Sequence, residues 1–191
     1  MLIFAGCMPT FNWREVRLEE QKIAATFPGK TDSITRTIDL AGTKLPMTMQ
    51  GVKVKELSYT IAWVKLPDAT PESNLAPNIL ASMQLGMLRN MGAATLDGSA
   101  AKMTPEITDA QIQLTDVSGK AISKVAAKKV IVTPAAGSKE SGTEMQMNAL
   151  FAAHAGYAFQ IVAVGSAEQF RQSAQAAESA KIFLESVRFI D

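Results

Sequence analysis

Cysteine and histidine are nearly absent from this chain, which has one of each in 191 residues. A single cysteine forms neither an intrachain disulfide nor a cysteine-based zinc site. Any Ser-His-Asp or Cys-His arrangement would have to use His154, and no G-x-S-x-G motif occurs in the sequence. His154 stands beside Ala155-Gly156, a predicted turn, so we expect an exposed turn histidine. These observations predict a protein that is not an enzyme and that holds no metal or cofactor.

Neither sign of charge dominates, because 19 lysines and arginines oppose 18 aspartates and glutamates, for a net charge of +1. Nucleic-acid binding usually needs a clustered basic face, so no nucleic-acid partner is expected. No apolar run approaches the ~20 residues of a membrane-spanning helix. The length suits one domain with a sizeable core, and we place that domain at 13–191.

The first seven residues form a short apolar run that ends in Ala5-Gly6-Cys7. Small residues before a cysteine are typical of bacterial lipoprotein signals, in which a peptidase cuts after the small pair and the cysteine becomes lipid-modified. The pattern predicts a signal over 1–7, cleavage after Ala5 and Gly6, lipidation at Cys7 and a tether over 8–12. Three positions before the cysteine, where such signals usually have leucine, this chain has Phe4. Only six residues precede Cys7, fewer than the ~7–15 of an apolar signal region, which indicates that the recorded start is late.

Lipidation at Cys7 would attach the protein to a membrane on the periplasmic side of the bacterial cell envelope. The residue after the cysteine is Met8 rather than the aspartate that retains some lipoproteins at the inner membrane, which favours the outer membrane. The alternative is a buried cysteine in an apolar first strand of a cytosolic protein, since free cysteine is often buried.

Periodicity predicts strands through most of 13–64, and apolar residues on both parities of 59–64 predict a strand covered by helices on both faces. A first helix follows, with Asn74 as its N-cap and Gly92 at its end. Its apolar stripe contains Leu80, Met83, Met87 and Met91.

The second half begins with residues 93–110, which show weak periodicity and predict a long surface loop. Further strands are expected around Ile112, Val130–Val132, 145–151 and 157–164, and a closing strand at 187–190. Between them, Ser166 and Gln169 match a capping box at the start of the last helix. The expected buried stripe of that helix contains Phe170, Ala174, Ala177 and Leu184. This order predicts an α+β fold with a mainly antiparallel sheet.

Several short motifs resemble the PsbP/Mog1-like proteins, and particularly the uncharacterised bacterial envelope lipoproteins that look like them. The motifs are Phe27-Pro28-Gly29-Lys30, Tyr59-Thr60-Ile61-Ala62-Trp63, Leu66-Pro67 and the run Phe183 to Phe189. The resemblance covers roughly 13–190. It implies an α/β/α sandwich with a central antiparallel sheet and a binding or assembly role, and it carries over no functional residues.

Three further patterns point weakly to a site. The loop 137–143 has phosphate-loop glycine spacing but lacks the lysine before Thr143. Glu19-Glu20 and Asp109 are carboxylates that nothing in the sequence brings together. Lys120, Lys124, Lys128 and Lys129 form the densest basic cluster, which suits either anionic lipid head groups or a solvated face.

The sequence therefore favours a lipid-anchored envelope protein that acts as a non-catalytic binding or assembly module for a protein partner. Two alternatives stay open. One is a small-ligand carrier or enzyme that uses a pocket between sheet and helix, and the other is a soluble cytosolic binding module.

Overall fold

The computed structural model describes residues 11–67, 75–94, 103–135 and 144–191. The predicted signal with Ala5, Gly6 and Cys7, the predicted N-cap Asn74 and the glycine-containing loop 137–143 lie outside the described residues.

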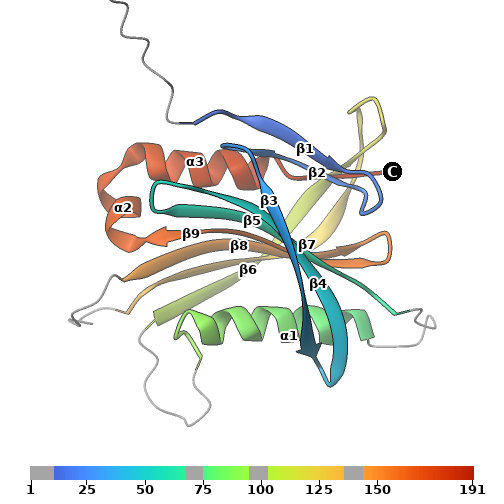
Figure 1. Cartoon of the computed structure of the whole chain (residues 1–191), viewed down its shortest axis with the longest axis horizontal. Helices are drawn as coiled ribbons and strands as arrows, with labels where there is room; N and C mark the ends of the chain where they lie inside the picture. Colours follow the sequence, from blue (N-terminus) through green and yellow to red (C-terminus); the bar gives the residue numbers. More distant parts are fainter. Residues whose placement is uncertain (1–10, 68–74, 95–102, 136–143) are drawn as a thin grey trace, which may run out of the picture.

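The described residues form ten strands and three helices (Figure 1). In chain order they are β1 (Arg14–Leu18), β2 (Ile23–Phe27), β3 (Asp32–Leu40), β4 (Thr43–Val54), β5 (Leu57–Lys65), α1 (Leu75–Asn90), β6 (Met103–Thr115), β7 (Ala121–Pro134), β8 (Met145–His154), β9 (Tyr157–Ser166), α2 (Ala167–Gln172), α3 (Ala174–Glu185) and β10 (Arg188–Ile190). Within these residues, no helix combines the length and the apolar character needed to cross a membrane.

All ten strands belong to one sheet in the order β1-β2-β10-β6-β7-β8-β9-β5-β4-β3. Its pairs are antiparallel except for β10 with β6, which makes the sheet mixed. The expected α/β/α sandwich is therefore wrong, because one large sheet dominates the molecule and few helices accompany it.

The prediction of the architecture failed because of residues 103–134. The sequence predicted a surface loop up to residue 110, but β6 begins at Met103 and pairs with the 14-residue β7 along nearly its whole length. These two strands widen the sheet beyond what α1 and α3 can cover, and most of their side chains stay exposed. The apolar residues of this strand change parity, from Met103 and Ile107 to Ile112 and Leu114, so no single alternation runs through it for a sequence-based prediction.

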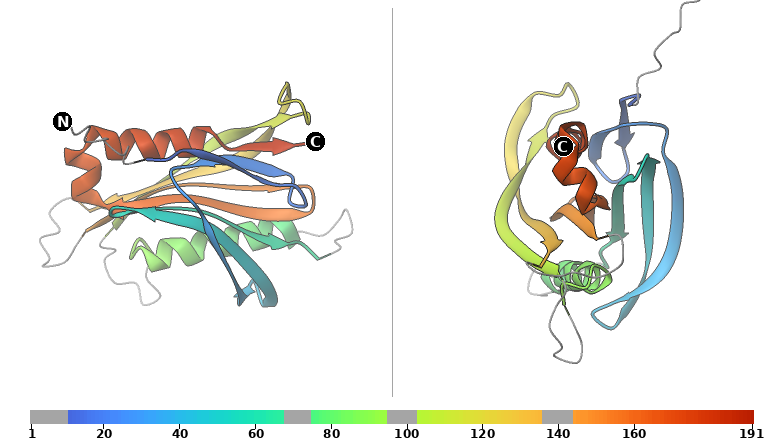
Figure 2. Two further views of the ribbon diagram at one scale, coloured as in Figure 1. Left: turned by 45° about the horizontal axis from the view of Figure 1, so that its top comes forward. Right: turned by 90° about the vertical axis from the view of Figure 1, so that its left-hand side faces the viewer.

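Helices lie against opposite faces of the sheet, and Figure 2 shows α3 inside its curve with α1 on the other side. The strand β5 follows the predicted two-sided pattern, since Tyr59 and Ile61 join the core around α3 while Ala62 and Val64 join the core around α1. Alternate side chains of one strand therefore belong to two separate cores.

The predicted methionine stripe of α1 packs against the sheet. Met83 is buried, while Leu80, Met87 and Met91 are partly buried against the same core. The helix ends at Asn90, and the expected glycine follows it: Gly92 takes a φ of +68° and donates its N–H to the carbonyl of Arg89.

The last helical segment differs from the prediction, because it breaks at Ser173 into α2 and α3. Ser166 stands at the N-cap of α2 without a side-chain capping bond, whereas the Ser173 hydroxyl caps α3 by accepting from the N–H of Ala176 at 3.2 Å. The break resets the helical phase, so the buried stripe of α3 differs from the predicted one. It consists of Ala176, Ser179, Ala180 and Phe183.

A buried hydroxyl pair fixes α3 to the sheet. Tyr59 Oη lies 2.7 Å from Ser179 Oγ, and Ser179 in turn donates to the carbonyl of Ala176 at 2.8 Å. Because the serine proton is used in that bond, the tyrosine hydroxyl is the donor to Ser179. Burial raises the pKa of Tyr59.

We expect Ser179→Ala to destabilise the protein more than Tyr59→Phe. The alanine variant leaves the tyrosine hydroxyl buried without an acceptor, at a cost of about 1–3 kcal/mol, whereas removing the tyrosine hydroxyl costs about 0.5–1.5 kcal/mol. Urea unfolding of both variants and of the double variant measures this difference. The double variant should be more stable than Ser179→Ala alone, and the opposite order would contradict the assignment of donor and acceptor.

Candidate functional site: a lysine-lined groove beside α3

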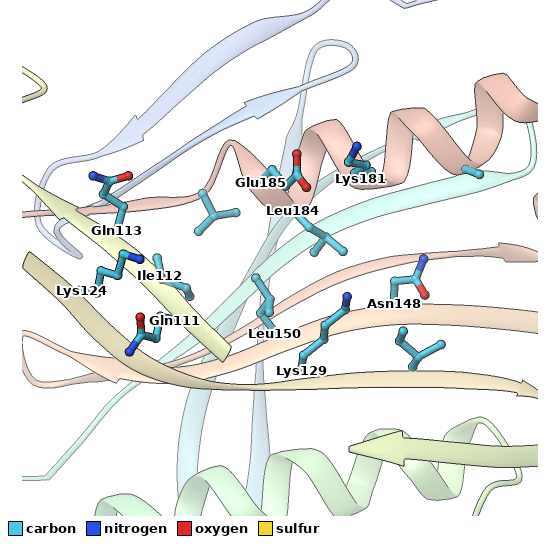
Figure 3. A pocket seen from close by; sticks show the side chains of 13 residues that line it. Gln111, Ile112, Gln113, Lys124, Lys129, Asn148, Leu150, Lys181, Leu184 and Glu185 are labelled. Carbon is cyan, nitrogen blue, oxygen red and sulfur yellow. The ribbon is translucent and has the colours of Figure 1, made fainter. Parts of the chain in front are cut away.

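A groove of ≈ 440 Å³ lies between α3 and strands β6, β7 and β8 (Figure 3). We call it the α3 groove. Its polar lining residues are Gln111, Gln113, Lys124, Lys129, Asn148, Lys181 and Glu185. Its apolar lining residues are Ile112, Ile131, Leu150, Ala177, Leu184 and Val187.

The helical wall of the groove is a second stripe of α3. Ala177, Lys181 and Leu184 follow one another at spacings of four and three, which places them on one helical face. The buried stripe with Ala180 and Phe183 lies next to it around the helix. The predicted core residues Ala177 and Leu184 therefore line the groove, where Ala177 is exposed and Leu184 is half-buried.

The sheet wall is made by neighbouring residues of β7 and β8. Lys129 stands opposite Leu150 in the antiparallel register, and Ile131 stands opposite Asn148. The intervening Val130 points to the core around α1. Figure 3 shows Lys129 and Asn148 rising from the sheet toward the helix, while Leu184 points from the helix toward Leu150.

Positive charge exceeds negative charge in the groove, since three lysines accompany Glu185 alone. In the described part of the chain, Lys124, Lys129 and Lys181 form no ion pair. The adjacent Lys128 behaves differently, because its ammonium lies 2.6 Å from the carboxylate of Asp109 on β6. The lysines of the groove are thus available for an anionic ligand.

The groove combines three chemical functions. Each lysine ammonium supplies three donors for carboxylates or phosphates, and the side-chain amides of Gln111, Gln113 and Asn148 both donate and accept hydrogen bonds. Leu150 and Leu184 supply an apolar strip between these polar groups. Such a surface is suited to an anionic ligand that also carries peptide-like amides and an apolar group.

The carboxylates named from the sequence do not meet. Glu20 accepts a hydrogen bond from the hydroxyl of Tyr157 at 3.1 Å, while Asp109 on β6 pairs with Lys128 on β7. Burial of Tyr157, followed by that hydrogen bond, raises the pKa of its hydroxyl. Glu20 and Asp109 thus take part in separate local contacts.

His154 ends β8 at the predicted Ala155-Gly156 turn, but it is half-buried rather than exposed. Its ring centroid lies 4.5 Å from that of Phe189 on β10. The turn was predicted correctly and the exposure was not, because the closing strand β10 reaches this end of the sheet.

Within the described ranges, no group of three or more histidine, cysteine, aspartate or glutamate side chains is placed to hold a metal ion. The basic cluster was the one sequence signal that led toward the groove, since it contains Lys124 and Lys129. Sequence reasoning missed Lys181 and the three amides. The helical spacing of Ala177, Lys181 and Leu184 was the signal that could have found the lysine.

No protein-family model matches this chain, and a search of the curated proteins gives no match.

Proposed function

We propose that this protein is a lipid-anchored binding module of the bacterial envelope that holds an acidic segment of a partner protein in the α3 groove. The observation that carries the proposal is the set of lysines without ion pairs beside side-chain amides and an apolar strip. Because these lysines come from β7 and α3, two walls of the groove offer positive charge to one ligand.

An acidic peptide matches each part of the lining. Its carboxylates would pair with Lys129 and Lys181, which extend from opposite walls in Figure 3. Its backbone amides match Asn148 as donor and acceptor. An apolar side chain of the peptide would pack between Leu150 and Leu184, which lie between the charged groups.

The anchor belongs to the same proposal. Ala5-Gly6-Cys7 supports lipidation, and residues 8–12 would tether the domain. Two or more acyl chains hold a protein stably at a bilayer, whereas one chain gives marginal binding. A tethered domain also meets membrane-bound partners at a raised effective concentration, so modest affinity in the groove would suffice.

One observation favours a second candidate function, that of a carrier for a small anionic amphiphile. The groove volume of ≈ 440 Å³ falls in the range of small-molecule sites, and its lining mixes charged and apolar groups. The same lysines would then hold a carboxylate or phosphate head group.

The test is photo-crosslinking in cells with p-benzoylphenylalanine in place of Leu150, which lines the groove. Ile122, exposed on β7 and outside the groove, provides the control position. We expect a crosslink to an acidic peptide of an envelope protein from position 150 only. A crosslinked species smaller than a protein would favour the carrier function, and no crosslink specific to position 150 would contradict both.

Charge reversal adds a second arm to this experiment. Lys129→Glu with Lys181→Glu should reduce the crosslink yield by roughly tenfold or more, since each lost charge pair across a complex changes affinity substantially. The matched control reverses Lys44 and Lys65, which do not line the groove. Equal loss in both double variants would contradict a role for the groove lysines.

A further inference from the structure

Among the residues that the structure describes, β3 is the last strand of the sheet and pairs only with β4. Figure 2 shows it in light blue at the outer border of the sheet. An edge strand presents a row of backbone N–H and C=O groups that can pair with another strand. In β3 that row is nine residues long, and its register with β4 is continuous from Asp32 to Leu40.

The two edges of the sheet differ in how well they are protected. The opposite edge strand, β1, has five residues, and its Glu15 carboxylate pairs with Arg17 and with Arg188. These bonds lower the pKa of Glu15, the one to Arg17 contributing most. In contrast, β3 has nine residues with no proline or bulge, and its charged residues Asp32, Arg36 and Asp39 are of both signs, so that they can pair with a second copy.

The exposed half of β3 is rich in residues that favour strands. Ile34 is 47% exposed and joins neither core, whereas Leu40 at the other end is buried against the core around α1. Asp32 and Arg36 flank Ile34 on the same face of the strand, because side chains alternate with a period of two. Among the described residues, Asp32 and Arg36 take part in no ion pair.

These three residues are self-complementary. In an antiparallel pair of β3 strands centred on Ile34, the two isoleucines face each other, and Asp32 of each copy faces Arg36 of the other. A two-fold axis creates both charge pairs at once, and opposite charges directly across an antiparallel pair stabilise it. Centring the pair on Arg36 instead would place two arginines opposite each other. The charge pattern therefore favours the register centred on Ile34 over the one centred on Arg36.

We propose that β3 is a homodimerisation edge, at which a second copy of this chain adds its own β3 in antiparallel register about Ile34. The two ten-stranded sheets would then form one continuous sheet across the interface. The contact is small and depends on one strand from each copy, so the dimer is expected to be weak and concentration-dependent. It involves none of the residues of the α3 groove and stands independently of the proposed function.

The test is sedimentation equilibrium of the full chain over a wide concentration range, in a Cys7→Ser background that excludes disulfide-linked dimers. Asp32→Arg alone places two arginines opposite each other, and Arg36→Asp alone places two aspartates opposite each other. The two-fold axis repeats each unfavourable pair, so each single variant should weaken dimerisation by roughly tenfold or more. The double variant restores opposite charges in the swapped arrangement and should dimerise like the parent. Circular dichroism confirms that each variant is folded.

A cysteine at the centre of the register gives an independent measurement. In the same background, Ile34→Cys should form a disulfide-linked dimer on mild oxidation, because residues on the two-fold axis directly oppose each other. The control Ile122→Cys, at an equally exposed position of β7, should not. A monomer at every concentration would overturn the proposal, as would a dimer that is unaffected by either single charge reversal.

Discussion

Truncation of Phe183 to alanine should lower the free energy of unfolding by about 3–5 kcal/mol. Phe183 is fully buried, and its ring centroid lies 5.0 Å from that of Phe27 and 5.5 Å from that of Tyr59. The variant loses this packing and leaves a cavity between α3 and the sheet. Because domains of this kind are stable by only about 5–15 kcal/mol, the loss is a large fraction of the total.

Urea denaturation measures this effect, and Ile182→Ala serves as the matched control. Ile182 is the preceding residue of α3 and is 39% exposed, so its truncation should cost much less. Similar losses in the two variants would contradict the placement of Phe183 as the main anchor of the helix. Phe183 also positions the helical wall of the α3 groove, since Leu184 follows it directly.

The proposed lipid anchor predicts that substitution of Cys7 by serine releases the protein from the membrane completely. Serine does not provide the thiol that accepts the lipid, so a protein that is anchored in its native form would be recovered in the soluble fraction. Membrane fractionation of the natively expressed protein measures the release, and intact mass should show two or three acyl chains on the parent. With two or more chains, anchoring is stable, and the change is nearly all-or-none.

The matched control is Met8→Ser, which places a serine one residue later and keeps the thiol. It should stay in the membrane fraction with its lipid mass intact. An unmodified Cys7 in a protein that fractionates with the cytosol would contradict the anchor, and it would favour the soluble binding module.

Local patterns predicted the elements of this fold better than their assembly. The two-sided strand at Tyr59 and Ile61 and the end of the helix before Gly92 follow from alternation and from backbone freedom, which are properties of a few neighbouring residues. The break between α2 and α3 at Ser173 could not be predicted from such local patterns, because Ser166 is an equally good capping residue. Phe170 of α2 and Phe183 of α3 are both buried in the core around α3, a placement that depends on residues far away in the sequence.

The architecture was predicted wrongly because strand pairing joins residues far apart in sequence. Nothing near Met103 shows that β6 will pair on one side with β7 and on the other, in parallel, with β10. The candidate site has the same difficulty. The sequence could identify Lys124 and Lys129 as a cluster, but only the packing of α3 against the sheet brings Lys181 to the opposite wall.

The position of β10 has a consequence for how the chain reaches its native state. These three residues, 188–190, lie between β2 at residues 23–27 and β6 at residues 103–115. The sheet is therefore continuous only after residues 188–190 have been synthesised, and contacts across such separations in sequence make folding slow. Until residues 188–190 have emerged, no strand lies between β2 and β6, so the two parts of the sheet stay separate.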